Sequence, residues 1–148
     1  MKVIIFEKDG EACIHAPYTD NGHTCETQLN KQDFKDSTNN AELYIQDDSE
    51  FPSKILFNAW EIKNKKMALN IPKGKEVAHT IRREKRTIAL ADNIEQIKQD
   101  AAGIPIKGNA QTLKNENAAY MSDIDDVSQL AIDAATNEAE LLEALVEL

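Results

Sequence analysis

Aromatic side chains make up only 5% of this 148-residue chain, which has a single tryptophan, Trp60. Any core must therefore be built mostly from Ile, Leu, Val and Ala. Long apolar runs are also missing, since none approaches the roughly 20 residues that a transmembrane helix needs. The run Val3–Phe6 is much shorter than the apolar part of a secretory signal and ends in charged residues. We therefore expect neither a membrane partner nor secretion.

Cysteine occurs only twice, as Cys13 and Cys25. Two cysteines in a chain without a signal peptide indicate free thiols in a reducing compartment. The sequence therefore predicts a soluble protein in the cytoplasm of the cell that makes it.

Positive charge is in short supply, because 17 Lys and Arg stand against 26 Asp and Glu and leave a formal charge of -9. An acidic protein of this kind binds nucleic acid and anionic membranes poorly. The charge is uneven, however: residues 73–86 hold six basic and two acidic side chains, whereas nine acidic and no basic ones follow Lys114. The basic run IRREKR at 81–86 resembles a phosphate-binding patch. A solvated helix face, or one that docks on the acidic end of the chain, is the favoured interpretation.

The segments Val3–Phe6 and Ala12–His15 predict a first β-hairpin. Asp9-Gly10 lies between them, and an Asp-Gly pair between apolar runs is typical of a two-residue hairpin turn. A short helix over Thr27–Asp33 and a short strand over Glu42–Gln46 are expected next.

A second hairpin is predicted over residues 60–71. Large apolar side chains alternate in Trp60–Ile62 and again in Met67–Ile71, so each segment presents one apolar face, as a strand does. Lys63–Lys66 would form a solvated four-residue turn between the two strands.

Helix signals begin directly after this hairpin. Asn70 is a favoured N-cap, and Pro72 is tolerated in a first helical turn. We expect helix from there until Gly103, which is a typical terminator. The apolar stripe shifts around the axis near Ala89, which predicts that the helix either bends or changes its packing there.

Three more helices are expected in the rest of the chain. The first follows the glycine-containing link 107–109, the second begins at Ser122 or Asp123, and the third begins at Asn137. Asn137 and Glu140 have the spacing of a capping box. The apolar face of the last helix consists of Leu141, Leu142, Leu145 and Val146.

Together these patterns predict an α+β fold. A small N-terminal antiparallel β module of two hairpins would occupy residues 1–71, and a C-terminal helical region of three to four helices would occupy residues 72–148. The two parts would form either one continuous domain or a module with an extended helical arm. The predicted structural anchors at the joint are Phe57, Trp60, Asn70 and Pro72.

The stretch CIHAPYTDNGHTC contains a candidate zinc site, with Cys13, His15, His23 and Cys25 as ligands. Residues two apart on a strand share a face, so the two pairs could converge on one ion. Each pair is separated by a single residue, however, whereas zinc ligands usually have two to four residues between them. Cys13 also fits a small apolar strand position. We therefore favour a chain without a metal or other cofactor.

The sequence carries no glycine-rich phosphate loop and no nucleophile elbow. The three histidines, His15, His23 and His79, lie outside any catalytic motif. We therefore expect a protein that is not an enzyme.

Residues 51–86, FPSKILFNAWEIKNKKMALNIPKGKEVAHTIRREKR, resemble a family of small proteins of tailed phages and prophages. Asn70 stands where the family usually has a capping Asp. Gly74 replaces the usual Ala, which weakens the first helical turn. The closing stretch AIDAATNEAELLEAL is similar to the family as well. The matching positions are Asp47, Asp48, Pro52, Phe57, Ala59, Trp60, Lys73, Glu76, Ile81, Arg82 and Arg86.

Members of this family are typically encoded beside tail-fibre genes and resemble tail assembly chaperones. The resemblance therefore implies a non-enzymatic role in assembly or attachment of a tail or tail fibre, in the cytoplasm of the bacterial host or in the virion. It implies no catalytic residues. One alternative is a phage-encoded inhibitor of a host defence or regulatory protein, for which the acidic C-terminal part would mimic nucleic acid. Another is a structural virion component such as a tail adaptor.

Amphipathic helical stripes suit burial against another chain. We expect this partner to be a tail-fibre or other tail protein, or a second copy of the chain. The predicted binding residues are Val77, Ile81, Arg82, Arg86, Leu141, Leu142 and Leu145.

Overall fold

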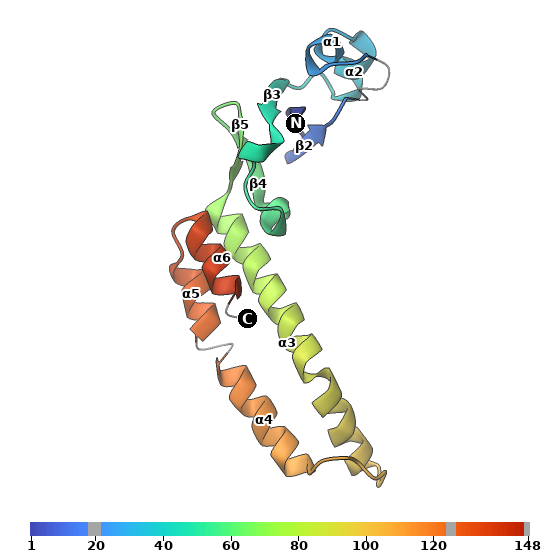
Figure 1. Cartoon of the computed structure of the whole chain (residues 1–148), viewed down its shortest axis with the longest axis vertical. Coiled ribbons are helices and arrows are strands. Elements are labelled where there is room, and N and C mark those ends of the chain that lie inside the picture. The colour runs from blue at the N-terminus through green and yellow to red at the C-terminus, as the bar shows by residue number, and fades with distance from the viewer. Residues whose placement is uncertain (18–21, 124–126, 147–148) are drawn as a thin grey trace. The chain divides into compact units, whose positions relative to one another are not determined.

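The computed structural model describes residues 1–17, 22–123 and 127–146 (Figure 1). The chain divides into two compact units, Met1–Gly74 and Lys75–Leu148. The first unit holds antiparallel strands and short helices, and the second is helical, so the predicted α+β class is confirmed. The boundary falls three residues after the predicted one at residue 71.

The first hairpin forms as predicted, from β1 (Lys2–Lys8) and β2 (Glu11–His15). Asp9 and Gly10 both have positive φ, at 55° and 80°, which is the backbone of a type I′ turn. Lys8 therefore pairs directly with Glu11 across the turn.

Strand β1 lies in the centre of a three-stranded sheet. The predicted strand at 42–46 is β3 (Tyr44–Asp47), and it pairs antiparallel with the other edge of β1, giving the order β2-β1-β3. Successive side chains of a strand point to opposite faces. Ile4 and Phe6 consequently enter one apolar cluster, while Val3 and Ile5 enter another.

Two short helices cover the Ile4 face of this sheet: α1 (Cys25–Leu29) and α2 (Gln32–Ser37). Cys25 and Phe34 are the residues that these helices bury in the cluster with Ile4. The prediction of one helix over 27–33 is wrong, because Lys31 is extended, with ψ 125°, and separates the two. Thr24 starts α1 earlier by accepting a hydrogen bond from the Thr27 backbone N–H in a capping box.

The second hairpin, β4 (Trp60–Lys63) and β5 (Lys66–Leu69), packs on the opposite face of β1. Its turn has two residues, not the predicted four, because Asn64 and Lys65 both have positive φ. Lys63 and Lys66 pair across the turn as the last and first residues of the strands. Ile71, predicted as strand, is the first residue of a helix.

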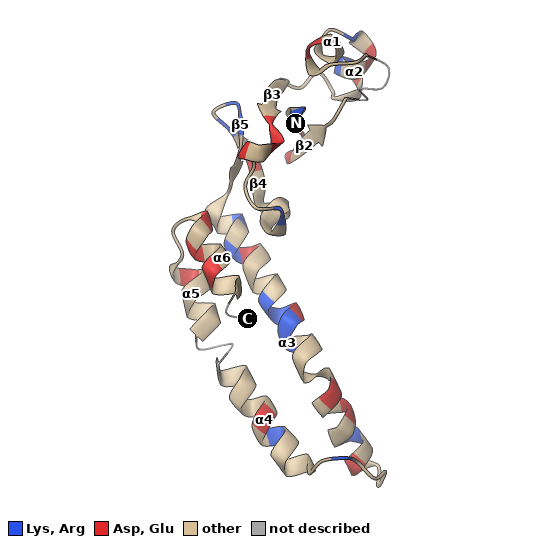
Figure 2. Ribbon diagram, in the orientation of Figure 1, with Lys and Arg blue, Asp and Glu red and all other residues tan. Residues whose placement is uncertain are grey.

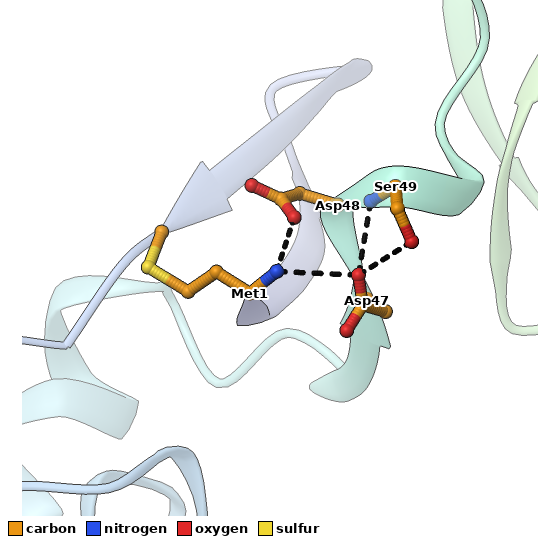
Figure 3. Close-up of polar contacts among 4 residues, drawn as sticks. All are labelled: Met1, Asp47, Asp48 and Ser49. Carbon is orange, nitrogen blue, oxygen red and sulfur yellow. Dashed lines mark hydrogen bonds and ion pairs between the residues drawn. The ribbon is translucent and has the colours of Figure 1, made fainter.

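The strand β3 leads into two 3₁₀ helices, η2 (Asp48–Glu50) and η3 (Lys54–Ala59). Asp47 caps η2 by accepting hydrogen bonds from the backbone and side chain of Ser49 (Figure 3). The Met1 amino group donates to Asp47, at 3.2 Å, and to Asp48 (Figure 3). These contacts join the start of β1 to the end of β3.

Helix α3 (Ile71–Ala101) begins where the sequence predicted and runs without a break past Ala89. The Asn70 side chain accepts a hydrogen bond from the Lys73 backbone N–H at 3.0 Å, as an N-cap does. Gly103 ends the helix with φ 76°, and the Ile104 N–H bonds the Gln99 carbonyl in a Schellman motif.

Three further helices follow: α4 (Ala110–Asp123), α5 (Gln129–Ala134) and α6 (Glu138–Val146). The prediction of a helix start at Ser122 or Asp123 is wrong, since both residues belong to the end of α4, and the Ile124–Asp126 stretch lies outside the described residues. Asn137 caps α6 as predicted, by accepting from the Glu140 N–H. The Glu140 carboxylate, however, accepts hydrogen bonds from Thr136, not from Asn137.

In the helical unit, α4, α5 and α6 return along α3 (Figure 1). Asn93 of α3 donates to Asn117 of α4 at 2.9 Å. Lys75 and Lys85 of α3 donate to the carbonyls of Asp133 and Leu145, which lie in the last turns of α5 and α6. A positive charge at the C-terminal end of a helix is favourable because the helix dipole is negative there. None of the helices that the structure describes has the length and apolar character needed to cross a membrane.

Candidate interaction surfaces

The residues predicted to bind a partner are largely buried within the chain. Leu141 is 0%, Leu145 5% and Arg82 6% exposed, so the prediction is wrong for these three side chains. The other four, Val77, Ile81, Arg86 and Leu142, are half-buried. Periodicity shows that a helix buries a stripe but not which chain covers it.

Two of the four predicted structural anchors, Trp60 and Asn70, make contacts that fix them within the chain. The Trp60 ring packs against Phe51, with centroids 5.5 Å apart, and Trp60 Nε1 donates to the Ser53 carbonyl. Asn70 both caps α3 and donates through Nδ2 to Glu61 at 2.7 Å. Pro72 lies in the first turn of α3, but it is exposed.

Phe57 is exposed too, at 59%. In η3 the neighbouring Leu56 and Ala59 are fully buried, whereas Ile55 is 57% exposed. Ile55 and Phe57 are thus both exposed, one on each side of the buried Leu56 in the sequence, and we name these two residues the Ile55–Phe57 surface. Exposed large apolar side chains are candidates for contact with another protein.

The candidate zinc ligands are not brought together around one point. Cys25 is buried in the cluster with Ile4, where burial raises the pKa of its thiol, and Cys13 packs against the same cluster. His15 stacks on Phe34, with ring centroids 4.6 Å apart, while His23 lies 3.1 Å from the Lys31 ammonium group. Within the described residues, no three His, Cys, Asp or Glu side chains gather as they would around a metal ion.

A scan against protein-family models and searches of curated proteins and of solved structures each found no match. A function for the chain therefore rests on its own residues and their contacts.

A histidine–carboxylate pair lies in the helical unit, and the sequence analysis missed it. His79 Nε2 of α3 is 2.8 Å from Asp133 Oδ1 of α5, although 54 residues separate the two. Lys75, one turn before His79, donates to the Asp133 backbone carbonyl. These contacts tie Asp133 of the acidic C-terminal region to the first part of α3, ahead of the IRREKR run. No local spacing signals a pair this far apart in the chain.

The opposite side of α3 carries a second exposed surface. Its residues recur at helical spacing, and all are exposed: Thr80, Glu84, Thr87, Ile88, Ala91 and Glu95, which we name the outer face of α3. Ile88 has 76% of its surface exposed. Part of this face forms a shallow hollow lined by Thr80, Arg83, Glu84, Thr87 and Ile88.

The electrostatics of the described residues are mild away from the start of the chain. The Ser49 hydroxyl and backbone N–H, followed by the Met1 amine, lower the pKa of Asp47 to about 2. In return, Asp48 and Asp47 raise the pKa of the Met1 amine. In the helical unit, the Thr136 backbone and hydroxyl lower the pKa of Glu140. The shifts of Asp47 and Glu140 arise chiefly from hydrogen bonds that their carboxylates accept at the starts of η2 and α6.

Proposed function

We propose that the protein acts without catalysis, by binding another protein during assembly or attachment of a phage tail or tail fibre. The observation that carries the proposal is the Ile55–Phe57 surface. It lies inside residues 51–86, the stretch that resembles small tailed-phage proteins. An aromatic side chain held on a rigid turn loses little entropy on binding and suits a central contact in an interface.

The contacts around the Ile55–Phe57 surface support its use as a rigid contact. Leu56 between the two exposed residues is 0% exposed, and Trp60 immediately after η3 packs on Phe51. The Leu56 N–H bonds the Ser53 carbonyl at 3.0 Å, and Trp60 Nε1 donates to the same carbonyl at 3.3 Å. The backbone that presents Ile55 and Phe57 is therefore held at both ends.

The proposed partner is the tail-fibre protein encoded beside this gene. Co-expression should raise the amount of soluble, correctly trimeric fibre protein, and the two proteins should co-purify. Phe57→Ser should abolish co-purification, whereas Ile14→Ser, which removes an equally apolar side chain that is 43% exposed on β2, should not. Absence of a neighbouring fibre gene, or fibre solubility and trimerisation that do not depend on the protein, would overturn the chaperone role.

Two alternatives are decided by related measurements. A structural tail adaptor would be found by mass spectrometry in purified virions, from which an assembly chaperone is absent. An inhibitor of a host protein would recover a defence or regulatory protein from host lysate through its acidic C-terminal part. Acidic residues of that part make contacts within the chain: Asp133 contacts His79, and Glu140 contacts Thr136. These contacts favour packing over nucleic-acid mimicry.

A further inference from the structure

Strand β2 forms one edge of the three-stranded sheet, whose order is β2-β1-β3. In a hairpin closed by a two-residue turn, the two residues that flank the turn exchange backbone hydrogen bonds, and every second pair along the ladder does the same. Glu11 flanks the turn, so Cys13 and His15 bond β1 as well. Ala12 and Ile14 alternate with them and direct their N–H and C=O groups away from β1.

The pairing of β1 with β3 gives the same result independently. The Asp48 N–H donates to the Met1 carbonyl at 2.9 Å, so the odd-numbered residues of β1 bond β3 and its even-numbered residues bond β2. Among the residues that the structure describes, none hydrogen-bonds to the backbone groups of Ala12 or Ile14. The edge of β2 therefore presents four unpaired backbone groups.

Folded proteins usually guard such an edge, because its unpaired groups recruit other strands. The second hairpin shows one such guard: the Met67 N–H at the edge of β5 donates to the Gln46 side chain at 2.7 Å. Apart from Glu11 at its start, however, β2 carries no Lys, Arg, Asp or Glu (Figure 2). Ile14 on this strand is 43% exposed. The chemistry of the edge thus fits one kind of occupant, a further β-strand.

The side chains of β2 indicate which strand fits. In an antiparallel second copy of β2 that is centred on Cys13, Ala12 pairs with Ile14 of the second copy on both sides of the centre, and all four groups are bonded. Glu11 then lies opposite His15 of the second copy, where an imidazole N–H can donate to the carboxylate. A parallel copy in the same register would place Glu11 opposite Glu11, which is unfavourable.

We propose that β2 is the interface of an antiparallel homodimer, in which the sheets of two copies join in the order β3-β1-β2-β2-β1-β3. In this isologous contact the same edge is used twice, and the two-fold axis passes between Cys13 and its counterpart. The axis is perpendicular to the sheet, so α1 and α2 of both copies cover the same face of the joined sheet. Backbone groups make most of the interface, and a side-chain substitution on β2 leaves them in place.

The association state of the full chain tests this interface. Sedimentation equilibrium should give a mass that approaches twice the 16.5 kDa chain as the concentration rises. Ala12→Pro removes an outward N–H, which an edge strand tolerates in the monomer but which the dimer needs in both copies. It should raise the dissociation constant at least about tenfold. Ala12→Ser keeps the N–H and is the matched control, which should leave the constant unchanged.

A parent protein that stays monomeric up to about 1 mM would overturn the proposal, as would a dimer that Ala12→Pro leaves intact. Denaturation followed by Trp60 fluorescence distinguishes a loss of association from a loss of fold. If Ala12→Pro does not fold, amide hydrogen exchange of the parent decides instead. Exchange at Ala12 and Ile14 should slow as the concentration rises, and exchange that is independent of concentration would exclude the interface.

A charge exchange tests the antiparallel direction. Glu11→Lys places a cation opposite His15 of the second copy and should raise the dissociation constant about threefold or more. Adding His15→Glu to that variant restores an opposite-charge pair and should restore association. In a parallel dimer the double variant would bring like charges together, so weaker association than that of Glu11→Lys alone would overturn the antiparallel arrangement. The Ile55–Phe57 surface lies on η3 and not on β2, so dimerisation and fibre binding are measured separately and either can fail alone.

Discussion

The two units of the chain bury their central element in different ways. In the first, β1 is covered on both faces, by α1 and α2 over Ile4 and by the second hairpin over Ile5. In the second, the other helices contact one side of α3, while Ile88 on the other side is 76% exposed. A strand with two apolar faces must be enclosed to fold at all, whereas a helix needs only one covered stripe. The outer face of α3 is therefore not needed for packing within the helical unit.

The two units also differ in the interactions that stabilise them. The first unit is held mainly by apolar packing around β1, including the aromatic contacts of Phe6 with Phe34 and of Phe51 with Trp60. The helical unit has no such ring pairs among its described residues, and α3 instead sends Lys75 and Lys85 to the ends of α5 and α6. Trp60 fluorescence reports the first unit, and helical circular dichroism reports chiefly the second. The comparison can be tested by perturbing one unit at a time.

The largest effect is expected from Ile5→Ala. Ile5 is fully buried, and its truncation leaves a cavity in the cluster that also contains Trp60, at a cost of about 3 kcal/mol. Denaturation followed by Trp60 fluorescence should shift by that amount, with little change in the helical transition. Ile14→Ala, on the exposed side of the neighbouring strand, is the control and should cost less than about 1 kcal/mol. Coincident shifts in both signals would mean that the units unfold as one.

The converse perturbation is Leu141→Ala in α6. Leu141 is 0% exposed, but α5 and α6 are short and can settle toward the cavity, so we expect about 2 kcal/mol. The shift should appear in the circular-dichroism transition and not in the fluorescence of Trp60. Val146→Ala, at an 83% exposed position of the same helix, should change neither. A larger fluorescence than helical shift would contradict the division into units.

Asn70→Ala should affect both signals, because Asn70 caps α3 and also donates to Glu61 in β4. Loss of an N-cap costs about 1 kcal/mol. The Asn109 side chain caps α4 in the same way, by accepting hydrogen bonds from the Gln111 and Thr112 N–H groups. Asn109→Ala removes this cap and should shift only the helical transition. If Asn70→Ala leaves the fluorescence transition in place, its bond to Glu61 contributes nothing to the first unit.

The smallest effect is a pH dependence of the first unit. The pKa of Asp47 is about 2 in the folded chain, lower than its ordinary value of 3.8, so its ionised form stabilises the fold. That contribution is present above about pH 4 and is lost as the pH falls toward 2. At neutral pH the free energy of unfolding, followed by Trp60 fluorescence, should therefore be larger for the parent than for Asp47→Asn. The difference between the two proteins should disappear as the pH falls toward 2. Asp9→Asn, in the hairpin turn, is the control for the loss of one negative charge. A difference in stability between the parent and Asp47→Asn that persists at pH 2 would exclude stabilisation by the ionised Asp47 side chain.

Much of the fold followed from short stretches of sequence. Asp9-Gly10 predicted the first turn, and Asn70, Gly103 and Asn137 predicted helix ends that the structure confirms. These features depend on backbone angles and hydrogen bonds among residues a few positions apart, which a short stretch contains in full. The candidate surfaces were predicted less well, because Leu141 and Leu145 proved buried and Phe57 proved exposed.

The sequence by itself therefore determined the local structures: the hairpins, the helix caps and the order of a β-rich part before a helical part. Only the tertiary structure decided which apolar stripes are covered by the chain itself. It also decided that His79 meets Asp133, and that the first short helix breaks at Lys31. The physical reason is the sequence separation between the residues that interact. A turn or a cap is settled by its neighbours, whereas burial depends on which distant element covers a face, and no spacing within that face records it.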